Sequence, residues 1–193
     1  GDVDAITGFY FTSLLNLNAR GIKDEEVDVM MYPKYGVNLY GNAIIVSEQF
    51  LKEKPEAVKA FLRAFTKGMK DVLADPDASI KFVKERDALV DETIEKRRMK
   101  LAIESVIVTP EAKADGLGAV QSARLHDMVT QVSSAFELKN PVKADAIFNG
   151  SFLPAKAERM VFAKEVVHEH CRELASSLSR GAGEGWGEGR MPE

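Results

Sequence analysis

The feature that most restricts the fold of this chain is a change in hydrophobic periodicity near residue 47. Before it, apolar residues stand in short runs typical of strands, at 3–6, 27–32 and 42–46. After it, they recur at steps of three and four, most clearly behind Pro55, at Val58, Phe61, Leu62, Phe65, Met69, Val72 and Leu73. The pattern predicts a helix over 55–74 and an α/β chain that is mostly helical after a few strands.

Start and stop signals divide the rest of the chain. We expect further helices at 76–86, from an Asp91 N-cap toward 106, at 110–116 and at 119–136. A short helix is expected to begin at a Thr12 or Ser13 cap, and a short strand to cover 146–148. From about 176 to 193 the sequence is rich in Gly and Ser, a composition that predicts disorder.

Composition and charge exclude several classes of protein. The chain has 193 residues, with 26 Lys plus Arg against 30 Asp plus Glu, and no basic block longer than Arg97-Arg98. A nucleic-acid partner is therefore not expected. The single cysteine, Cys171, excludes an internal disulfide and a thiolate-cluster metal site. No apolar stretch approaches the roughly 20 residues needed to span a bilayer.

Five short motifs, taken in order, are similar to a known family. They are Gly1-Asp2-Val3-Asp4-Ala5-Ile6, the run Tyr40 to Val46, the run Lys54 to Phe65, Leu117-Gly118-Ala119-Val120 and Ser151-Phe152-Leu153-Pro154. Together they resemble the substrate-binding proteins of ABC importers, in the branch for nitrate, sulfonate, taurine and thiamine-pyrimidine precursors. The similarity covers roughly residues 1 to 160.

The resemblance implies the C-terminal portion of a type II periplasmic-binding-protein fold, in which two lobes clamp a ligand. Residues 1–31 would end the second lobe, 32–46 would form the hinge, and 47–160 would be the helical return to the first lobe. Residues 161–193 would be a helical extension with the disordered Gly-rich tail. Because the first residue is Gly1 and no targeting signal precedes it, we expect the chain to begin inside the fold.

The candidate ligand site lies where the first expected strand ends and a helix begins. A glycine break, two hydroxyls and a helix N-terminus would together present donors to a small anion. The residues expected to bind ligand are Gly8, Phe9, Tyr10, Thr12, Ser13, Tyr35, Tyr40 and Asn42. Alternatively, Thr12 or Ser13 only caps its own helix, and Tyr35 and Tyr40 only pack across the hinge.

The resemblance implies a periplasmic protein that captures a small solute and passes it to a membrane permease, without catalysis and without a cofactor, and that is monomeric when full length. Thr12-Ser13 stands where pyrimidine-binding members tend to carry an acidic residue, which favours an anionic solute such as nitrate, a sulfonate or taurine. The alternatives are a thiamine-pyrimidine-precursor binding or biosynthetic protein, and a non-transporting sensory module.

Two histidine-containing features invite a chemical interpretation. His168 and Cys171 share a helical face, but no second ligand cluster completes a tetrahedral zinc site. His126 is expected to be a solvated side chain. No arrangement typical of nucleophilic catalysis is present in the sequence.

Overall fold

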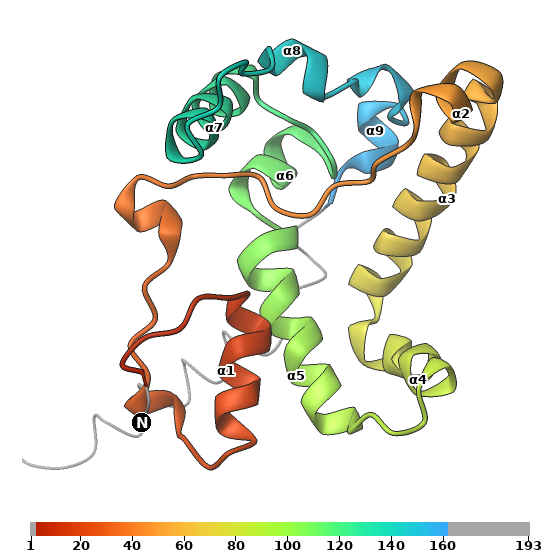
Figure 1. Cartoon of the computed structure of the whole chain (residues 1–193). Helices are drawn as coiled ribbons and strands as arrows, with labels where there is room; N and C mark the ends of the chain where they lie inside the picture. The colour runs from red at the N-terminus through yellow and green to blue at the C-terminus, as the bar shows by residue number, and fades with distance from the viewer. Residues whose placement is uncertain (1–2, 162–193) are drawn as a thin grey trace, which may run out of the picture. The chain divides into compact units, whose positions relative to one another are not determined.

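A computed structural model of the chain describes residues 3–161, and these form a series of helices joined by loops (Figure 1). The chain divides into two units, at 1–161 and 162–193, of which only the first contains described residues. The expected extension and disordered tail, with His168 and Cys171, fall outside the described residues. No helix among residues 3–161 is long and apolar enough to cross a membrane.

The strongest periodic signal gives the longest helix, as predicted. Helix α3 (Pro55–Ala74) begins with Pro55 in its first turn, where a missing N–H costs nothing. Its Val58 and Leu73 are buried, at 9% and 2% exposed. Helix α4 (Pro76–Arg86) follows directly, because the Asp75 carboxylate accepts from the N–H of Ala78 at 2.9 Å and caps it.

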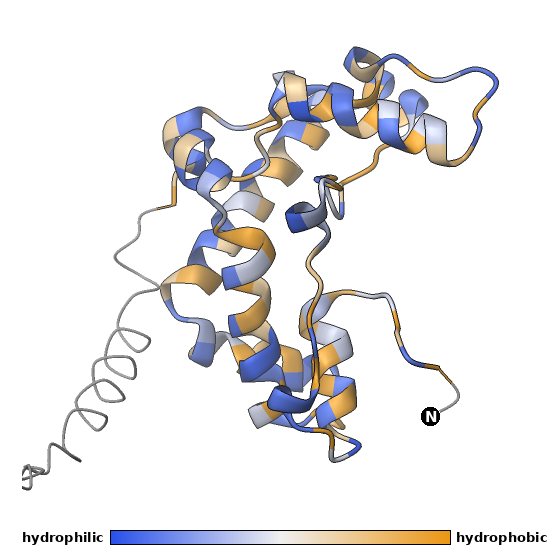
Figure 2. Cartoon of the chain, turned by 90° about the vertical axis from the view of Figure 1, so that its left-hand side faces the viewer, coloured by the Kyte–Doolittle hydropathy of each residue, from blue (hydrophilic) through white to orange (hydrophobic). Residues whose placement is uncertain are grey.

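Helix α5 (Glu92–Ala102) is capped by Asp91, as expected, and continues as the π-helical turn η3 (Ile103–Ile107). Both α1 (Tyr10–Asn18) and α4 pack against α5. The buried apolar side chains are Leu14, Leu15, Val58, Leu73, Ile80, Ile103, Val108, Leu125, Ala144 and Val161. Apolar and polar residues are interspersed along these helices (Figure 2).

Helices α6 (Pro110–Asp115) and α7 (Ser122–Ala135) complete the predicted set, with α7 three residues shorter at its start than expected. The sequence did not indicate the shorter elements. These are α2 (Glu48–Glu53) and α8 (Ala144–Ile147), and the 3-10 turns η1 (Asp24–Glu26), η2 (Tyr32–Tyr35) and η4 (Gly150–Phe152). Helix α9 (Lys156–Arg159) follows Pro154.

The prediction of strands at 3–6, 27–32 and 42–46 is wrong. Residues 3–161 contain no strand, and no backbone hydrogen bond pairs these three segments. Val27 has the dihedral angles of a strand, with φ −120° and ψ 114°, but its N–H donates to the nearby Asp24 carbonyl and no ladder with another described segment forms. Most of their apolar side chains are exposed, with Ile45 at 91%, and only Val27 and Met31 are half-buried. Strand propensity is present in these segments, but a strand forms only against a neighbour.

The strand predicted at 146–148 is also wrong, because residues 144–147 form helix α8 and Phe148 ends it in an extended conformation. Burial of Ala144 at 4% exposed and packing of α8 against α7 favour the helical turn there. The helical body is nevertheless compatible with the expected C-terminal portion of a binding-protein fold. The assignment of lobes and hinge by residue range stays a prediction.

Candidate functional site

The junction predicted to bind ligand is formed by the end of an extended segment and the start of α1. The structure corrects where this helix begins: its N-cap is Phe9, which is extended (φ −70°, ψ 126°), and no side chain caps it. The N–H groups of Thr12 and Ser13 both donate to the Phe9 carbonyl, at 2.9 and 2.8 Å. Thr12 and Ser13 therefore lie inside the first turn and do not act as caps.

This geometry leaves donors at the start of α1. Among the described residues, nothing accepts from the N–H groups of Tyr10 and Phe11, and the hydroxyls of Thr12 and Ser13 make no hydrogen bond. Gly8 permits the arrangement, because a Cβ at this position would lie 2.3 Å from Ser13 Oγ. Two backbone donors and two hydroxyls are thus available within one turn of a helix N-terminus.

Aromatic rings flank these donors. The rings of Phe9 and Phe11 are stacked, with centroids 5.5 Å apart and an interplanar angle of 23°, and Phe9 is 51% exposed. The Nη1 of Arg98 lies 3.5 Å from the Phe11 carbonyl, and its Nε pairs with Glu95 at 3.1 Å. The guanidinium that reaches the junction is therefore already neutralised.

The other predicted ligand residues are placed differently. Tyr35 is 62% exposed and ends the turn η2, and Asn42 is also exposed. Within residues 3–161, no hydrogen bond links Tyr35, Tyr40 or Asn42 to the junction at 8–13. The structure thus keeps Gly8 to Ser13 together without hydrogen bonds to Tyr35, Tyr40 or Asn42, and the role of all eight residues in binding stays a prediction.

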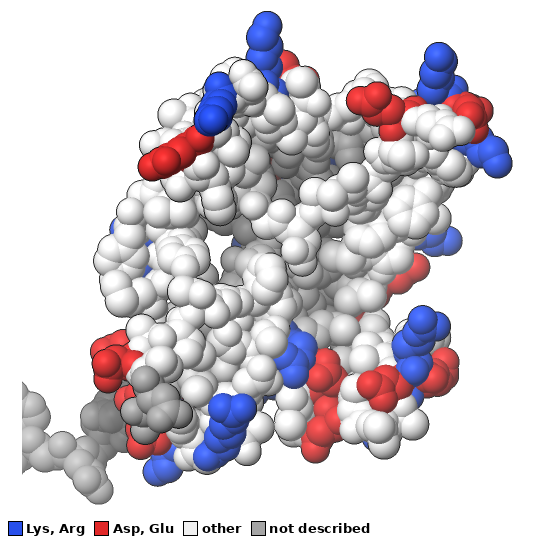
Figure 3. All heavy atoms as spheres, in the orientation of Figure 1, with Lys and Arg blue, Asp and Glu red and all other residues white. Residues whose placement is uncertain are grey.

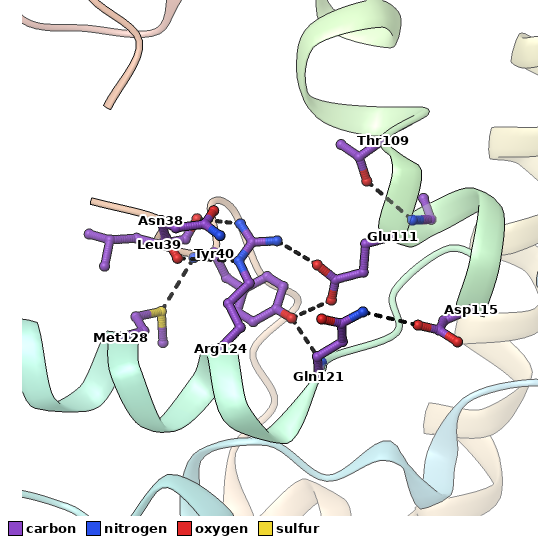
Figure 4. Close-up of polar contacts among 10 residues, drawn as sticks. Asn38, Leu39, Tyr40, Thr109, Glu111, Asp115, Gln121, Arg124 and Met128 are labelled. Atoms are coloured by element: carbon purple, nitrogen blue, oxygen red, sulfur yellow. Dashed lines mark hydrogen bonds and ion pairs between the residues drawn. The ribbon is translucent and has the colours of Figure 1, made fainter. Parts of the chain in front are cut away.

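Tyr40 belongs to a second polar cluster (Figure 4). Its hydroxyl donates to Glu111 Oε1 on α6 and accepts from the N–H of Gln121 at 2.8 Å. Burial of the hydroxyl, together with its hydrogen bond to Glu111, raises the pKa of Tyr40 above its usual 10.0. The phenol therefore stays protonated at neutral pH and acts as a donor to the carboxylate.

Arg124 on α7 completes this cluster. Its Nη1 pairs with Glu111 Oε2 at 2.6 Å, and the side chains of Arg124 and Glu111 are only 23% and 14% exposed. Its Nη2 and Nε donate to the carbonyls of Leu39 and Asn38 at 2.8 and 3.2 Å. Its guanidinium carbon also lies 4.0 Å from the centroid of the Tyr40 ring. This cation is held by the protein, which argues against its binding an anion.

Sequence reasoning identified Tyr40 but missed Glu111 and Arg124, its partners. Tyr40 and Glu111 are 71 residues apart, so no local pattern joins them. One signal was available: Gln121, the N-cap of α7, and Arg124 and Met128 on the helix follow one another at helical steps of three and four, and none of them belongs to the buried core.

Other chemistry is sparse in the described part of the chain. No group of three or more metal-ligating side chains is present among residues 3–161. The Nδ1 of His126 lies 2.8 Å from the Ser122 carbonyl, at the rim of an open groove of about 450 Å³ that Val129 and Val142 also line. The face shown in Figure 3 has acidic and basic side chains interspersed, with no large patch of one sign.

Residues 1–79 match the family described as NMT1/THI5 like. A relative, the riboflavin-binding protein RibY of Chloroflexus aurantiacus, is 33% identical over 87 residues, which are 43% of this chain and 24% of that protein. The chain thus spans about a quarter of the length of this relative. No solved structure matches the chain significantly. The N-terminal part of the chain is thus similar to this family and to this binding protein, and neither similarity points to the nitrate/sulfonate/taurine branch.

Proposed function

We propose that this chain is part of an extracytoplasmic solute-binding protein that delivers a small molecule to the permease of an ABC importer. The observation that carries the proposal is the junction at Gly8 to Ser13, where unused backbone donors and hydroxyls meet the exposed ring of Phe9, stacked on the half-buried ring of Phe11. Pockets for small molecules combine apolar walls with a few polar groups in this way. The junction also lies within the 79 residues that match the family.

The side chains at the junction favour a flat heterocyclic solute. The stacked rings of Phe9 and Phe11 offer an aromatic surface, and the hydroxyls of Thr12 and Ser13 can donate to ring carbonyl oxygens. The name of the relative, a riboflavin-binding protein, is consistent with such a ligand. The small anion expected from the sequence is the competing solute. It would rely on backbone and hydroxyl donors, because Arg98 is already paired with Glu95.

We further propose that the protein binds its solute without converting it. Among residues 3–161 the one histidine is His126, and its ring nitrogen Nδ1 contacts the Ser122 carbonyl in its own helix. Binding would then act by stabilising a closed arrangement of two lobes, which is the state a permease could recognise. Monomeric full-length protein and a periplasmic location are part of the same proposal.

The test is a titration of the full-length protein with riboflavin, nitrate and taurine, measured by calorimetry and, for riboflavin, by flavin fluorescence. The double variant Thr12→Ala, Ser13→Ala should bind its solute about thirtyfold more weakly, since each lost hydrogen bond contributes about 1 kcal/mol. Binding of riboflavin supports the heterocyclic solute, and binding of nitrate or taurine alone supports the anion.

The matched control is Thr93→Ala with Ser134→Ala. These two exposed helical hydroxyls lie on α5 and α7 and make no side-chain hydrogen bond to any described residue. This control should bind with wild-type affinity. Equal affinity of the two double variants would contradict the site assignment. Failure of all three solutes to bind the wild-type protein would contradict the solute classes proposed.

A further inference from the structure

One face of α7 is occupied by contacts to a single stretch of extended chain. The side chains of Gln121, Arg124, Met128 and Gln131 follow one another at steps of three, four and three residues, so they lie on the same side of the helix. Apart from the bonds that Gln121 and Arg124 make to Asp115 and Glu111 on α6, the side-chain hydrogen bonds of this face go to residues 36–40, and the N–H of Gln121 donates to the Tyr40 hydroxyl. We call residues 36–40 the strap.

The strap is held mostly through its backbone. Gln131 Nε2 donates to the Gly36 carbonyl at 3.1 Å, and the N–H of Tyr40 donates to Met128 Sδ at 3.4 Å. Arg124 donates to the carbonyls of Asn38 and Leu39. Because backbone groups are the ones bonded, the attachment fixes the path of the chain and not only the position of one side chain.

Glu111 joins this face to α6. Its two carboxylate oxygens accept from the Tyr40 hydroxyl and from Arg124, the two side chains with the most contacts in the cluster (Figure 4). It is 14% exposed, so loss of its charge would leave Arg124 with less compensation in a partly buried place. Glu111 makes no hydrogen bond to the strap backbone and acts through these two partners.

The next stretch of chain contrasts with the strap. Residues 41–46, which we call the free segment, make no hydrogen bond through backbone or side chain to any described residue. A Cβ at Gly41 would meet no atom within 4 Å. The chain is attached again at Ser47, whose hydroxyl accepts from the N–H of Phe50 at 3.2 Å and caps α2.

We infer that Glu111 is a positioning residue that locks the strap onto α6 and α7, so that bending of the interlobe crossover is confined to residues 41–46. The crossover is the hinge predicted at 32–46, and the inference rests on the proposed function, whose lobe closure it refines. The predicted hinge at 32–46 thus divides into a rigid part and a bending part. Hinges need only a few residues that absorb the change in dihedral angles, and the free segment supplies six of them.

The test measures backbone order parameters of the 193-residue chain by ¹⁵N relaxation, without any solute. In the wild-type chain, the strap should have values of about 0.85 and the free segment values below about 0.6. In Glu111→Gln, which removes the charge but keeps the size, strap values should fall toward those of the free segment. Tyr40→Phe, which removes one hydroxyl, is a milder second variant and should lower the order parameters of Asn38 and Leu39 less.

The matched control is Glu56→Gln, which makes the same charge change at an exposed ion pair with Lys59 and should leave the strap unchanged. Equal order in the strap and the free segment of the wild type would overturn the inference. So would an unchanged strap in both Glu111→Gln and Tyr40→Phe. Since no solute is present, these results do not depend on whether the protein binds riboflavin, an anion or neither.

Discussion

Replacement of Gly8 by alanine tests the geometry of the ligand junction directly. Gly8 does not have a positive φ, so alanine is not excluded by backbone conformation at this position. The added Cβ would lie 2.3 Å from Ser13 Oγ but 3.7 Å from Ser13 Cβ, which is ordinary contact. The conflict is therefore with one oxygen atom, and it disappears if that oxygen is absent.

The size of the effect follows from this single contact. To accept Gly8→Ala, the Ser13 hydroxyl must leave its position, at a cost of about 0.5–1.5 kcal/mol for a displaced side-chain torsion. The alanine also restricts the unfolded chain, which stabilises the protein by about 0.4–1 kcal/mol. In the wild-type background the two effects nearly cancel. In the Ser13→Ala background only the second remains, so the substitution should be stabilising.

The assay is urea unfolding of the four chains of the double-mutant cycle, followed by far-ultraviolet circular dichroism. The expected coupling energy between Gly8→Ala and Ser13→Ala is about 1 kcal/mol, above the roughly 0.3–0.5 kcal/mol within which independent sites add. Gly68→Ala is the control, because a Cβ there meets nothing within 4 Å, and it should not couple to Ser13→Ala. A coupling energy near zero for Gly8→Ala would refute the proposed approach of Ser13 to Gly8.

Two further predictions concern stability. Gly116→Ala should destabilise the chain by about 1–3 kcal/mol more than Gly36→Ala. Both glycines have φ 84°, but only at Gly116 would a Cβ meet Arg159, at 3.0 Å. Equal losses of stability in thermal unfolding would contradict this packing. The hydrogen bond from Arg97 lowers the pKa of Asp24 below 3.8, so the pair stabilises the folded chain above that pH and stops doing so as pH falls through the lowered pKa. Asp24→Asn should therefore lower the free energy of unfolding by only a few tenths of a kcal/mol at neutral pH, as loss of an exposed ion pair does. In unfolding curves recorded at decreasing pH, the stabilities of the variant and the wild type should converge below pH 3.8.

The helices were predictable because their signals are local. Pro55 opens α3, and Asp75 and Asp91 accept hydrogen bonds from the first turns of α4 and α5, all within a few residues of the helix they start. The strands were not, because a strand requires a partner that can lie anywhere in the chain. The apolar residues at 42–46 favour a strand, but no other described segment pairs with them through backbone hydrogen bonds.

The junction and the cluster at Tyr40 show the same limit. The position of the junction followed from a glycine next to hydroxyl residues, but the helix start did not, since Phe9 caps α1 without a polar side chain. The contacts of Tyr40 come from Glu111 and Gln121, which are 71 and 81 residues away. Contacts over such separations depend on how helices pack, and no periodicity within one element specifies them.

The division between strap and free segment separates two ways in which solute affinity can change. The junction at 8–13 and the strap both lie within the 79 residues that match the family, whereas Glu111 and the α7 face that hold the strap lie outside them. In the proposed mechanism, changes at the junction alter the intrinsic dissociation constant. Changes at Glu111 alter only the fraction of molecules whose lobes can close, and the apparent dissociation constant is the intrinsic one divided by that fraction. Variants of Glu111 should therefore shift the affinities for different solutes by one common factor, while variants of Thr12 and Ser13 should change their ratio.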